Sequence, residues 1–379
     1  MELENIVLVT GLGFLLALVF GAVANKTNFC TMGGISDWVN MGLTGRMGAW
    51  VLAMGIAIAG TQILELTGMV DIQSSIYRTT TFGLLGYVLG GVLFGIGMTL
   101  AGGCGQRTLV KVGNGSMKSL VVAIVLGLTA YMTLRGILAV IRVDWIDPFG
   151  VDLAASGVAD QGLASLLAHW FGFADGDGLR WGLALGIAGL LMVLALSQRA
   201  LRNDFNNLLA GIMIGLIVIC AWVITGLVGQ DDFDPVPVEG LTFVAPTGNT
   251  ISYLMTYTGA TINFGIAVVL GIIAGSFLYG LVTRSLRLET FNDRQDMLNH
   301  LGGAVLMGFG GVLSFGCTVG QGISGVSTLA VGSFIALFSI IFGSMMTIRV
   351  QYYRMDDRGW ANAFFTSLAD TLLPWRRTE

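Results

Sequence analysis

Nine long apolar stretches restrict the fold of this 379-residue chain more than any other feature. They lie at residues 6–24, 47–66, 82–100, 119–134, 181–196, 208–228, 264–282, 301–315 and 328–348. A helix that crosses a bilayer needs about 20 mostly apolar residues. Only 11% of this chain is charged, whereas soluble domains contain roughly 25%. We therefore expect an all-α integral membrane protein with about nine transmembrane helices.

The distribution of Lys and Arg predicts the orientation in the membrane. With the N-terminus outside, 15 of the 19 basic residues fall on the cytoplasmic side. The remaining four are Arg78, Arg135, Arg142 and Arg180. The positive-inside rule favours this arrangement, which places the C-terminus in the cytoplasm. The connection at residues 229–262 is expected to lie outside, because it contains four acidic residues and no Lys or Arg.

The chain also repeats itself at an offset of 213 residues. Seven of the fifteen positions from Gly90 to Cys104 are identical to their counterparts from Gly303 to Cys317. The two copies lie on the third and eighth apolar segments, so they run in opposite directions through the membrane. This pattern predicts an inverted repeat of four helices, a linking fifth helix and four more, from which transporters build one central site. A coincidence among glycine-rich helices is the alternative.

The repeat also divides the chain into four parts. The first half of the repeat covers residues 1–140, and an outer connection with the linking helix covers residues 141–200. The inverted second half covers residues 201–348. A cytoplasmic tail at residues 349–379 completes the chain.

Glycine-rich segments follow both copies of the repeat, at Cys104 and Cys317. The segments "CGQRTLVKVGNG" and "CTVGQGISG" end the apolar pattern, yet they are too small and too glycine-rich for solvent loops. Irregular backbone at membrane depth is tolerated only where protein buries it or water reaches it. We therefore expect two broken or re-entrant helices that meet near the middle of the membrane. Tight turns outside the membrane are the alternative.

A third cysteine lies in "NKTNFCTMGGISDW", residues 25–38, directly after the first apolar segment. This segment is too polar to cross the bilayer and too apolar for a typical loop. Cys30 is therefore expected in a third re-entrant element, with an interfacial connection as the alternative. Cys220 differs, since Leu, Ile and Val surround it, and we expect a packed structural residue. Gln62 and Glu65 are expected at the membrane interface.

The residues beside Cys30, Cys104 and Cys317 indicate a path for a small anion with soft, polarizable atoms. Backbone N–H groups at helix breaks bind anions without a fixed positive charge, and a thiol is a weak donor with a polarizable sulfur. The supporting residues are Asn28, Thr31, Gly103, Gly105, Gln106, Arg107, Lys111, Gly316, Thr318, Gln321, Gly322 and Ser324. Among them, Arg107 and Lys111 add positive charge that attracts an anion.

Several other classes of function are disfavoured. A net charge of −4 without a basic stripe argues against nucleic-acid binding. Four cysteines without a CxxC motif indicate neither a zinc site nor a disulfide scaffold, and we expect no catalytic residue, metal or cofactor. A membrane thiol oxidoreductase normally needs a proximal cysteine pair, and a soft-metal transporter needs clustered ligands. Both stay as rival hypotheses.

Three segments, "NFCTMGGISD", "GIGMTLAGGCGQRTLVKVGNGS" and "GFGGVLSFGCTVGQGISG", together resemble the YeeE/YedE family of bacterial inner-membrane sulfur transporters. Members with this three-cysteine pattern are thiosulfate transporters. The resemblance implies an hourglass-shaped inverted repeat and a substrate path marked by Cys30, Cys104 and Cys317. It also implies that intact thiosulfate passes by transient S–H to sulfur hydrogen bonds and supplies sulfur for cysteine biosynthesis.

The same resemblance implies a partner and an alternative substrate. The partner is a small cytoplasmic TusA-like sulfurtransferase, in addition to thiosulfate and the lipid bilayer. Related members have been associated with selenium compounds. Another sulfur or selenium compound is therefore the alternative substrate.

Overall fold

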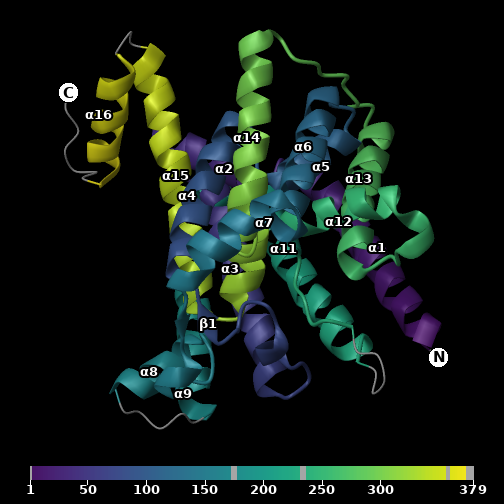
Figure 1. Ribbon diagram of the computed structural model, residues 1–379, viewed down its shortest axis with the longest axis vertical. Coiled ribbons are helices and arrows are strands. Elements are labelled where there is room, and N and C mark those ends of the chain that lie inside the picture. Colours follow the sequence, from purple (N-terminus) through teal and green to yellow (C-terminus); the bar gives the residue numbers. More distant parts are fainter. Residues whose placement is uncertain (1, 172–176, 231–235, 356–358, 373–379) are drawn as a thin grey trace.

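A computed structural model describes residues 2–171, 177–230, 236–355 and 359–372, which are almost wholly helical (Figure 1). The long helices are α1 (Glu2–Thr27), α3 (Gly45–Leu66), α4 (Leu84–Leu100), α6 (Met117–Arg135), α9 (Asp177–Ser197), α11 (Phe205–Val223), α13 (Phe264–Val282), α14 (Arg294–Leu313) and α15 (Val331–Met355). The shorter helices are α2 (Thr31–Ser36), α5 (Gly105–Gly113), α7 (Ile137–Ile141), α8 (Leu163–Phe171), α10 (Arg199–Arg202), α12 (Val244–Met255) and α16 (Trp360–Leu372). The π-helical and 3₁₀ turns are η1 (Asp37–Met41), η2 (Ile72–Ser74), η3 (Arg142–Ile146), η4 (Asp147–Phe149), η5 (Ala154–Ser156), η6 (Ile224–Val228), η7 (Tyr257–Gly259) and η8 (Gly320–Gly325). Two short strands, β1 (Thr81–Phe82) and β2 (Val151–Asp152), pair antiparallel.

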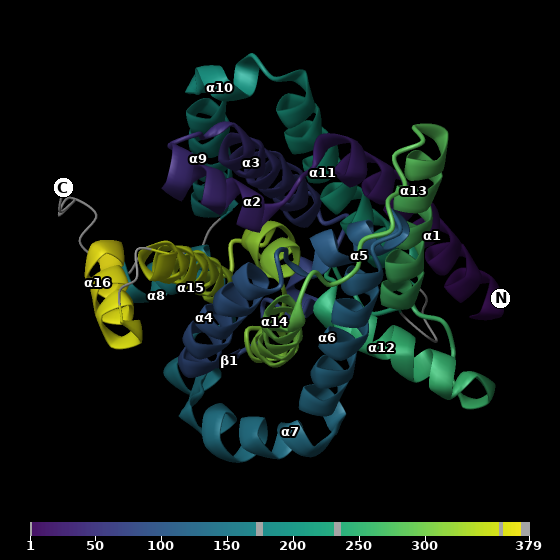
Figure 2. The same ribbon diagram turned by 90° about the horizontal axis from the view of Figure 1, so that it is seen from above.

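The all-α membrane architecture is confirmed. Eight helical stretches within the described residues are long and apolar enough to cross a membrane. The eighth expected segment, residues 301–315, falls on α14, whose first turn carries Arg294 and Asp296 and is therefore less apolar. This helix packs along α4 and α6 near the centre of the molecule (Figure 2). Because these helices cover much of its surface, its glycines are tolerated.

Helix contacts reproduce the inverted repeat. By the sequence offset, α4 corresponds to α14, α6 to α15 and α3 to α13. Helix α1 shifted by the same offset overlaps the C-terminal end of α11 and η6, so α11 is its counterpart. The contacts come in exchanged pairs: α4 packs on α15 as α14 packs on α6, and α1 packs on α13 as α11 packs on α3. The short elements follow the same rule, since α5 contacts α13 as η8 contacts α3. Helix α9 packs on α3 and links the two halves.

Repeated glycines bring α4 and α14 into backbone contact. A Cβ atom added at Gly97 would lie 2.6 Å from the carbonyl oxygen of Gly303, and one added at Gly303 would lie 2.6 Å from that of Gly97. The repeat-related pair Gly90 and Gly310 shows the same reciprocal approach, at 2.7 and 2.6 Å. Side chains larger than a hydrogen atom would separate these helices. The repeated glycines are therefore explained by the crossing of the two halves.

The connection at residues 229–262 contains a helix of its own. Helix α12 packs on α6 and α13, with five of its residues buried. The side of the membrane on which this connection lies stays a prediction. Helix α12 begins 213 residues after α2. It is thus the repeat partner of α2.

Arg78 is one of the four basic residues expected on the outer side. Its side chain is buried, with Nη2 2.8 Å from Asp160 Oδ2 and 3.5 Å from Glu65 Oε1. Gln62 is buried as well, and its Nε2 donates to Glu65 Oε2 at 3.1 Å. The depth of Gln62 and Glu65 at the membrane interface stays a prediction. These polar groups satisfy one another inside the protein, as buried charges must.

Candidate functional site

The three cysteines Cys30, Cys104 and Cys317 occupy the same position in three chain breaks. Two residues before each cysteine the backbone is left-handed: φ is 52° at Asn28, 66° at Gly102 and 57° at Phe315. Each cysteine then directly precedes a short helix, which is α2, α5 and the helical segment 318–327 around η8, respectively. A left-handed residue is a common way to end a helix. The chain therefore turns sharply and starts a second helix at the cysteine.

Two of the cysteine sulfurs bind backbone amides at the start of their short helices. The Sγ atoms of Cys30 and Cys317 accept hydrogen bonds from the amides of Gly33 and Gly320, both at 3.4 Å. These two thiols take the place that Ser or Asp usually occupies at a helix N-cap. Cys104 is also the N-cap residue of α5, but its side chain makes no capping hydrogen bond. Positive helix ends and soft sulfur atoms meet at all three breaks.

The three breaks come together inside the molecule. The side chains of Cys30 and Cys104 are close enough to interact, and the Cys104 thiol also reaches Thr318, the neighbour of Cys317. Cys104 and Cys317 are fully buried, and Cys30 is 7% exposed. Cys104 is the middle member of the series.

Several supporting residues hold the breaks in place. Arg107 Nη2 donates to Asn28 Oδ1 at 2.8 Å, and Lys111 Nζ donates to the carbonyl of Gly102 at 3.0 Å. In the second half, Gln321 Nε2 donates to the carbonyl of Ser314, and Ser324 Oγ donates to that of Leu241 at 2.9 Å. These contacts show a structural function for residues that the sequence suggested as ligands.

Four polar atoms beside the cysteines are buried without a hydrogen-bond partner among the described residues. They are Thr31 Oγ1, Gln106 Nε2, Thr318 Oγ1 and Gln321 Oε1. Gln106 Oε1, by contrast, accepts from the Cys104 thiol at 3.8 Å. Buried polar groups are normally paired, so such a set indicates water or a ligand that passes through.

The predicted glycines divide into crowded and roomy positions. A Cβ atom at Gly322 would lie 2.7 Å from the Trp50 ring, one at Gly103 would lie 3.0 Å from Arg107 Cγ, and one at Gly316 would lie 3.2 Å from the Gln321 amide. At Gly105 the nearest atoms would be 3.9 Å away. Close packing therefore explains Gly322 most clearly, and it does not explain Gly105.

Sequence reasoning missed several groups near the breaks. The backbone N–H of Phe243 faces Cys317, and Phe243 stands 213 residues after Cys30, so the repeat offset alone identifies it. Trp50 Nε1, Ser75 Oγ and Tyr77 OH are buried without a partner in the described part of the chain. These three lie outside the cysteine motifs. No local sequence signal marks them.

Cys220 is not packed as expected. It is a free cysteine exposed on the surface of α11. Apolar neighbours in the sequence did not reveal this, because the outward-facing side of a membrane helix is as apolar as its packed side. It lies apart from the three breaks, which makes it a matched control for them.

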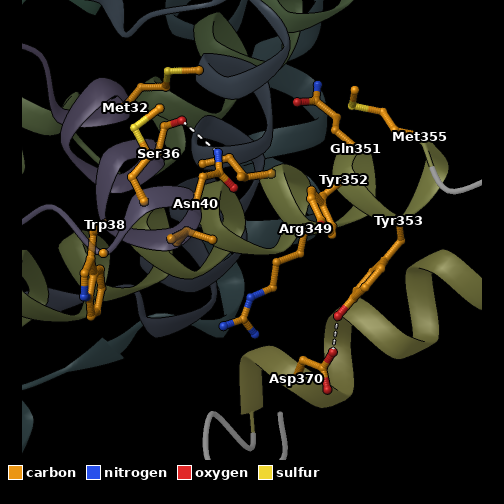
Figure 3. A pocket seen from close by; sticks show the side chains of 14 residues that line it. Met32, Ser36, Trp38, Asn40, Arg349, Gln351, Tyr352, Tyr353, Met355 and Asp370 are labelled. Carbon is orange, nitrogen blue, oxygen red and sulfur yellow. Dashed lines mark hydrogen bonds between the residues drawn. The ribbon is translucent and has the colours of Figure 1, made fainter. Parts of the chain in front are cut away.

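A cavity of about 730 Å³ lies beside the helix that Cys30 precedes (Figure 3). Met32 and Ser36 of α2 line one wall, and Arg349 and Tyr352 of α15 line another. Asn40 Nδ2 donates to Ser36 Oγ at 3.2 Å across the first of these walls. The cavity therefore lies between α2 and the C-terminal end of α15.

Comparison with known proteins agrees with this arrangement. The thiosulfate transporter TsuA of Escherichia coli is 25% identical over 362 residues, which cover 90% of this chain and 94% of that protein. The thiosulfate transporter TsuA of Spirochaeta thermophila is 25% identical over 337 residues, covering 88% and 96%. The pattern of the sulphur transport family matches residues 26–346, which include all three breaks. The chain therefore belongs to the sulphur transport family, YeeE/YedE.

Proposed function

We propose that this chain imports intact thiosulfate across the bacterial inner membrane along Cys30, Cys104 and Cys317, and so supplies sulfur for cysteine biosynthesis. Both relatives reported above are named thiosulfate transporters. The observation that carries the proposal is the continuous series from Cys30 through Cys104 to Thr318 and Cys317. With the N-terminus outside, thiosulfate meets Cys317 first, then Cys104 and then Cys30.

The chemistry of the thiols suits this ion. Thiosulfate carries a terminal sulfur that is soft and polarizable, and an S–H group is a weak donor to it. Weak contacts at successive sites let an ion enter and also leave. A hydroxyl in place of the thiol would be hard and strongly hydrated. The path therefore favours thiosulfate over sulfate, which lacks the terminal sulfur.

Removing a divalent anion from water without partners would cost tens of kcal/mol. The amides at the three helix starts and the unpartnered side chains of Thr31, Gln106, Thr318 and Gln321 supply polar contacts along the path. Arg107 and Lys111 lie within electrostatic range of Cys30 and add positive charge at that end. No single strong site is needed, because the contacts are shared among the three breaks.

The inner end offers a place for a partner protein. In the orientation with the C-terminus inside, the cavity between α2 and α15 opens toward the cytoplasm, beside the helix that Cys30 precedes (Figure 3). A TusA-like sulfurtransferase that docks there would receive thiosulfate as it leaves Cys30.

A membrane thiol oxidoreductase is the second candidate. The sequence argued against it because no cysteine pair is close in the chain, but the fold brings the thiols of Cys30 and Cys104 together. Oxidation of this pair to a disulfide would release two protons and would pass two electrons to a quinone. Such a reaction requires the quinone, whereas transport does not.

Uptake by purified protein in liposomes tests the proposal and separates the two candidates. Liposomes without quinone are loaded with buffer and given radiolabelled thiosulfate. We expect uptake by the wild-type protein and by C220A, and severe loss in C30A, C104A and C317A at matched protein content. Serine at the same positions should also impair uptake, because it replaces a soft donor with a hard one.

Three results would contradict this proposal. Normal uptake by the triple variant C30A/C104A/C317A would remove the cysteines from the path. Uptake that requires a quinone would favour the oxidoreductase. Competition by a selenium compound that is stronger than competition by unlabelled thiosulfate would identify a different substrate.

A further inference from the structure

The loop that follows α3 folds into the protein instead of covering its surface. Ser75 and Tyr77 are each 2% exposed, and Arg78 is 6% exposed. Ile76, between the first two, is 46% exposed, so the chain alternates between inside and outside at this point. The side chains of Ser75, Tyr77 and Arg78 are thus directed inward from a segment that belongs to no helix.

Arg78 fastens this loop to the helical segment that begins at Cys317. Its Nε and Nη2 atoms donate to Asp160 Oδ2 at 3.0 and 2.8 Å. Its Nη1 atom donates at 2.7 Å to the carbonyl of Thr328, directly after the segment 318–327. A guanidinium at the C-terminal end of a helix stabilises it. The loop therefore has a fixed position relative to Cys317.

Tyr77 lies against the same segment. A Cβ atom added at Gly325 would be 3.0 Å from Tyr77 Cδ1 and 2.8 Å from Gln321 Oε1, and the Tyr77 ring meets Trp222 edge-on at 6.3 Å. The hydroxyls of Tyr77 and Ser75 have no hydrogen-bond partner in the described residues. Leaving buried hydroxyls unpaired lowers the stability of the fold, so we infer that a ligand accepts hydrogen bonds from these hydroxyls.

The Tyr77 hydroxyl is protonated, and therefore a donor, at neutral pH. Burial raises the pKa of Tyr77 above its usual range, and the nearby Cys317 thiol raises it further. The phenol therefore keeps its proton. A neutral O–H group donates to an anion without a competing charge, and its hard oxygen prefers an oxygen acceptor.

We propose that the Tyr77 hydroxyl forms an oxyanion subsite beside the helical segment that Cys317 precedes, which binds the sulfonate oxygens of thiosulfate while the terminal sulfur faces the Cys317 thiol. This inference rests on the proposed function, since it assigns the substrate's oxygen end. Hard donors then contact hard acceptors, and the soft thiol contacts the soft sulfur. The subsite orients the ion before it enters the cysteine path.

The variants Y77F and Y87F separate binding from structure. The Tyr87 hydroxyl donates to Gln161 Oε1 at 3.1 Å, and the residue is as buried as Tyr77. We expect Y77F to keep the wild-type melting temperature and to raise the KM for thiosulfate uptake about ten-fold, the effect of losing one hydrogen bond to a charged group. Y87F should lower the melting temperature and leave KM unchanged.

Binding to purified protein gives a readout that is independent of transport. Thiosulfate and sulfate are titrated while tryptophan fluorescence is followed, because Trp222 touches the Tyr77 ring. We expect Y77F to weaken both ions and C317A to weaken only thiosulfate. If wild-type protein binds these ions but does not transport thiosulfate, the proposed function fails and the subsite stands. Wild-type binding and KM in Y77F, or a wild-type protein that binds neither ion, would overturn the subsite.

Discussion

Substituting Gly303 by Ala tests the crossing of the two repeat halves. The added Cβ atom would lie 2.6 Å from the carbonyl oxygen of Gly97 and 2.7 Å from the amide nitrogen of Ala101. Both atoms belong to the backbone, so no side-chain rotation relieves the contact and the helices must separate. The adjacent position is a matched control, since a Cβ atom at Gly302 meets nothing within 4 Å.

The expected difference between the two variants follows from two opposing effects. Ala is favoured over Gly in a helix by about 1 kcal/mol, and this gain applies to both positions. Overpacking costs about 1–3 kcal/mol and applies only to G303A. Comparison of the variants cancels the helix propensity. G303A should therefore be about 1–3 kcal/mol less stable than G302A, which at about 2 °C per kcal/mol is a difference of about 2–6 °C in melting temperature.

The measurement is a thermal unfolding curve of each variant in the same detergent, followed by tryptophan fluorescence. The inverted repeat adds a second requirement, because Gly97 meets Gly303 reciprocally. G97A should destabilise the protein by a similar amount. The double variant G97A/G303A should lose less free energy of unfolding than the sum of the two single variants, since the same separation of the helices makes room for both Cβ atoms. Equal melting temperatures for G302A and G303A would refute the close crossing.

Two further predictions concern charged groups outside the cysteine path. Burial raises the pKa of Glu239 to about 7 from 4.5, so between these values the folded protein holds a proton that the unfolded chain has lost. The melting temperature should therefore fall as the pH rises from about 5 to 7. E239Q should flatten this pH dependence of the melting temperature, and the control E289Q should not. A wild-type slope in E239Q would exclude Glu239 as its source. R78Q removes the Arg78 guanidinium, leaves Asp160 buried without its partner and should lower the free energy of unfolding by about 3–5 kcal/mol. The double variant R78Q/D160N should recover part of the melting temperature lost in R78Q. No recovery would show that the pair is not coupled.

The sequence predicted the elements whose signal is local or repeated. Long apolar runs specify membrane helices because no other element satisfies the backbone in lipid. The repeated glycines predicted the inverted repeat, because the same spacing occurs on both segments, whereas the α4–α14 crossing emerged only from the structure. The helix breaks at the three cysteines were also predictable, since glycine-rich segments interrupt the apolar pattern there.

Features that depend on distant partners were not predictable. Arg78 resembles an ordinary loop cation until Asp160, 82 residues away, is placed beside it. Helix α12 has a composition typical of a loop, and only its neighbours bury it. Phe315 has a positive φ of 57°, which the bulk of its side chain disfavours. In each case tertiary contacts override the local preference of the sequence.

The repeat explains why the proposed path has three thiols and not four. Cys104 and Cys317 are equivalent, and the element beside each of them is also equivalent: Cys30 precedes α2, and Phe243 precedes α12. Two thiols therefore meet at the first half, whereas at the second half Cys317 meets a backbone N–H from Phe243. If thiosulfate enters at Cys317, it first meets a site of amides and hydroxyls, which bind its oxygens. It then reaches the thiols of Cys30 and Cys104, which contact its terminal sulfur. The symmetric fold supplies two similar places, and the replacement of one cysteine by phenylalanine makes them chemically different.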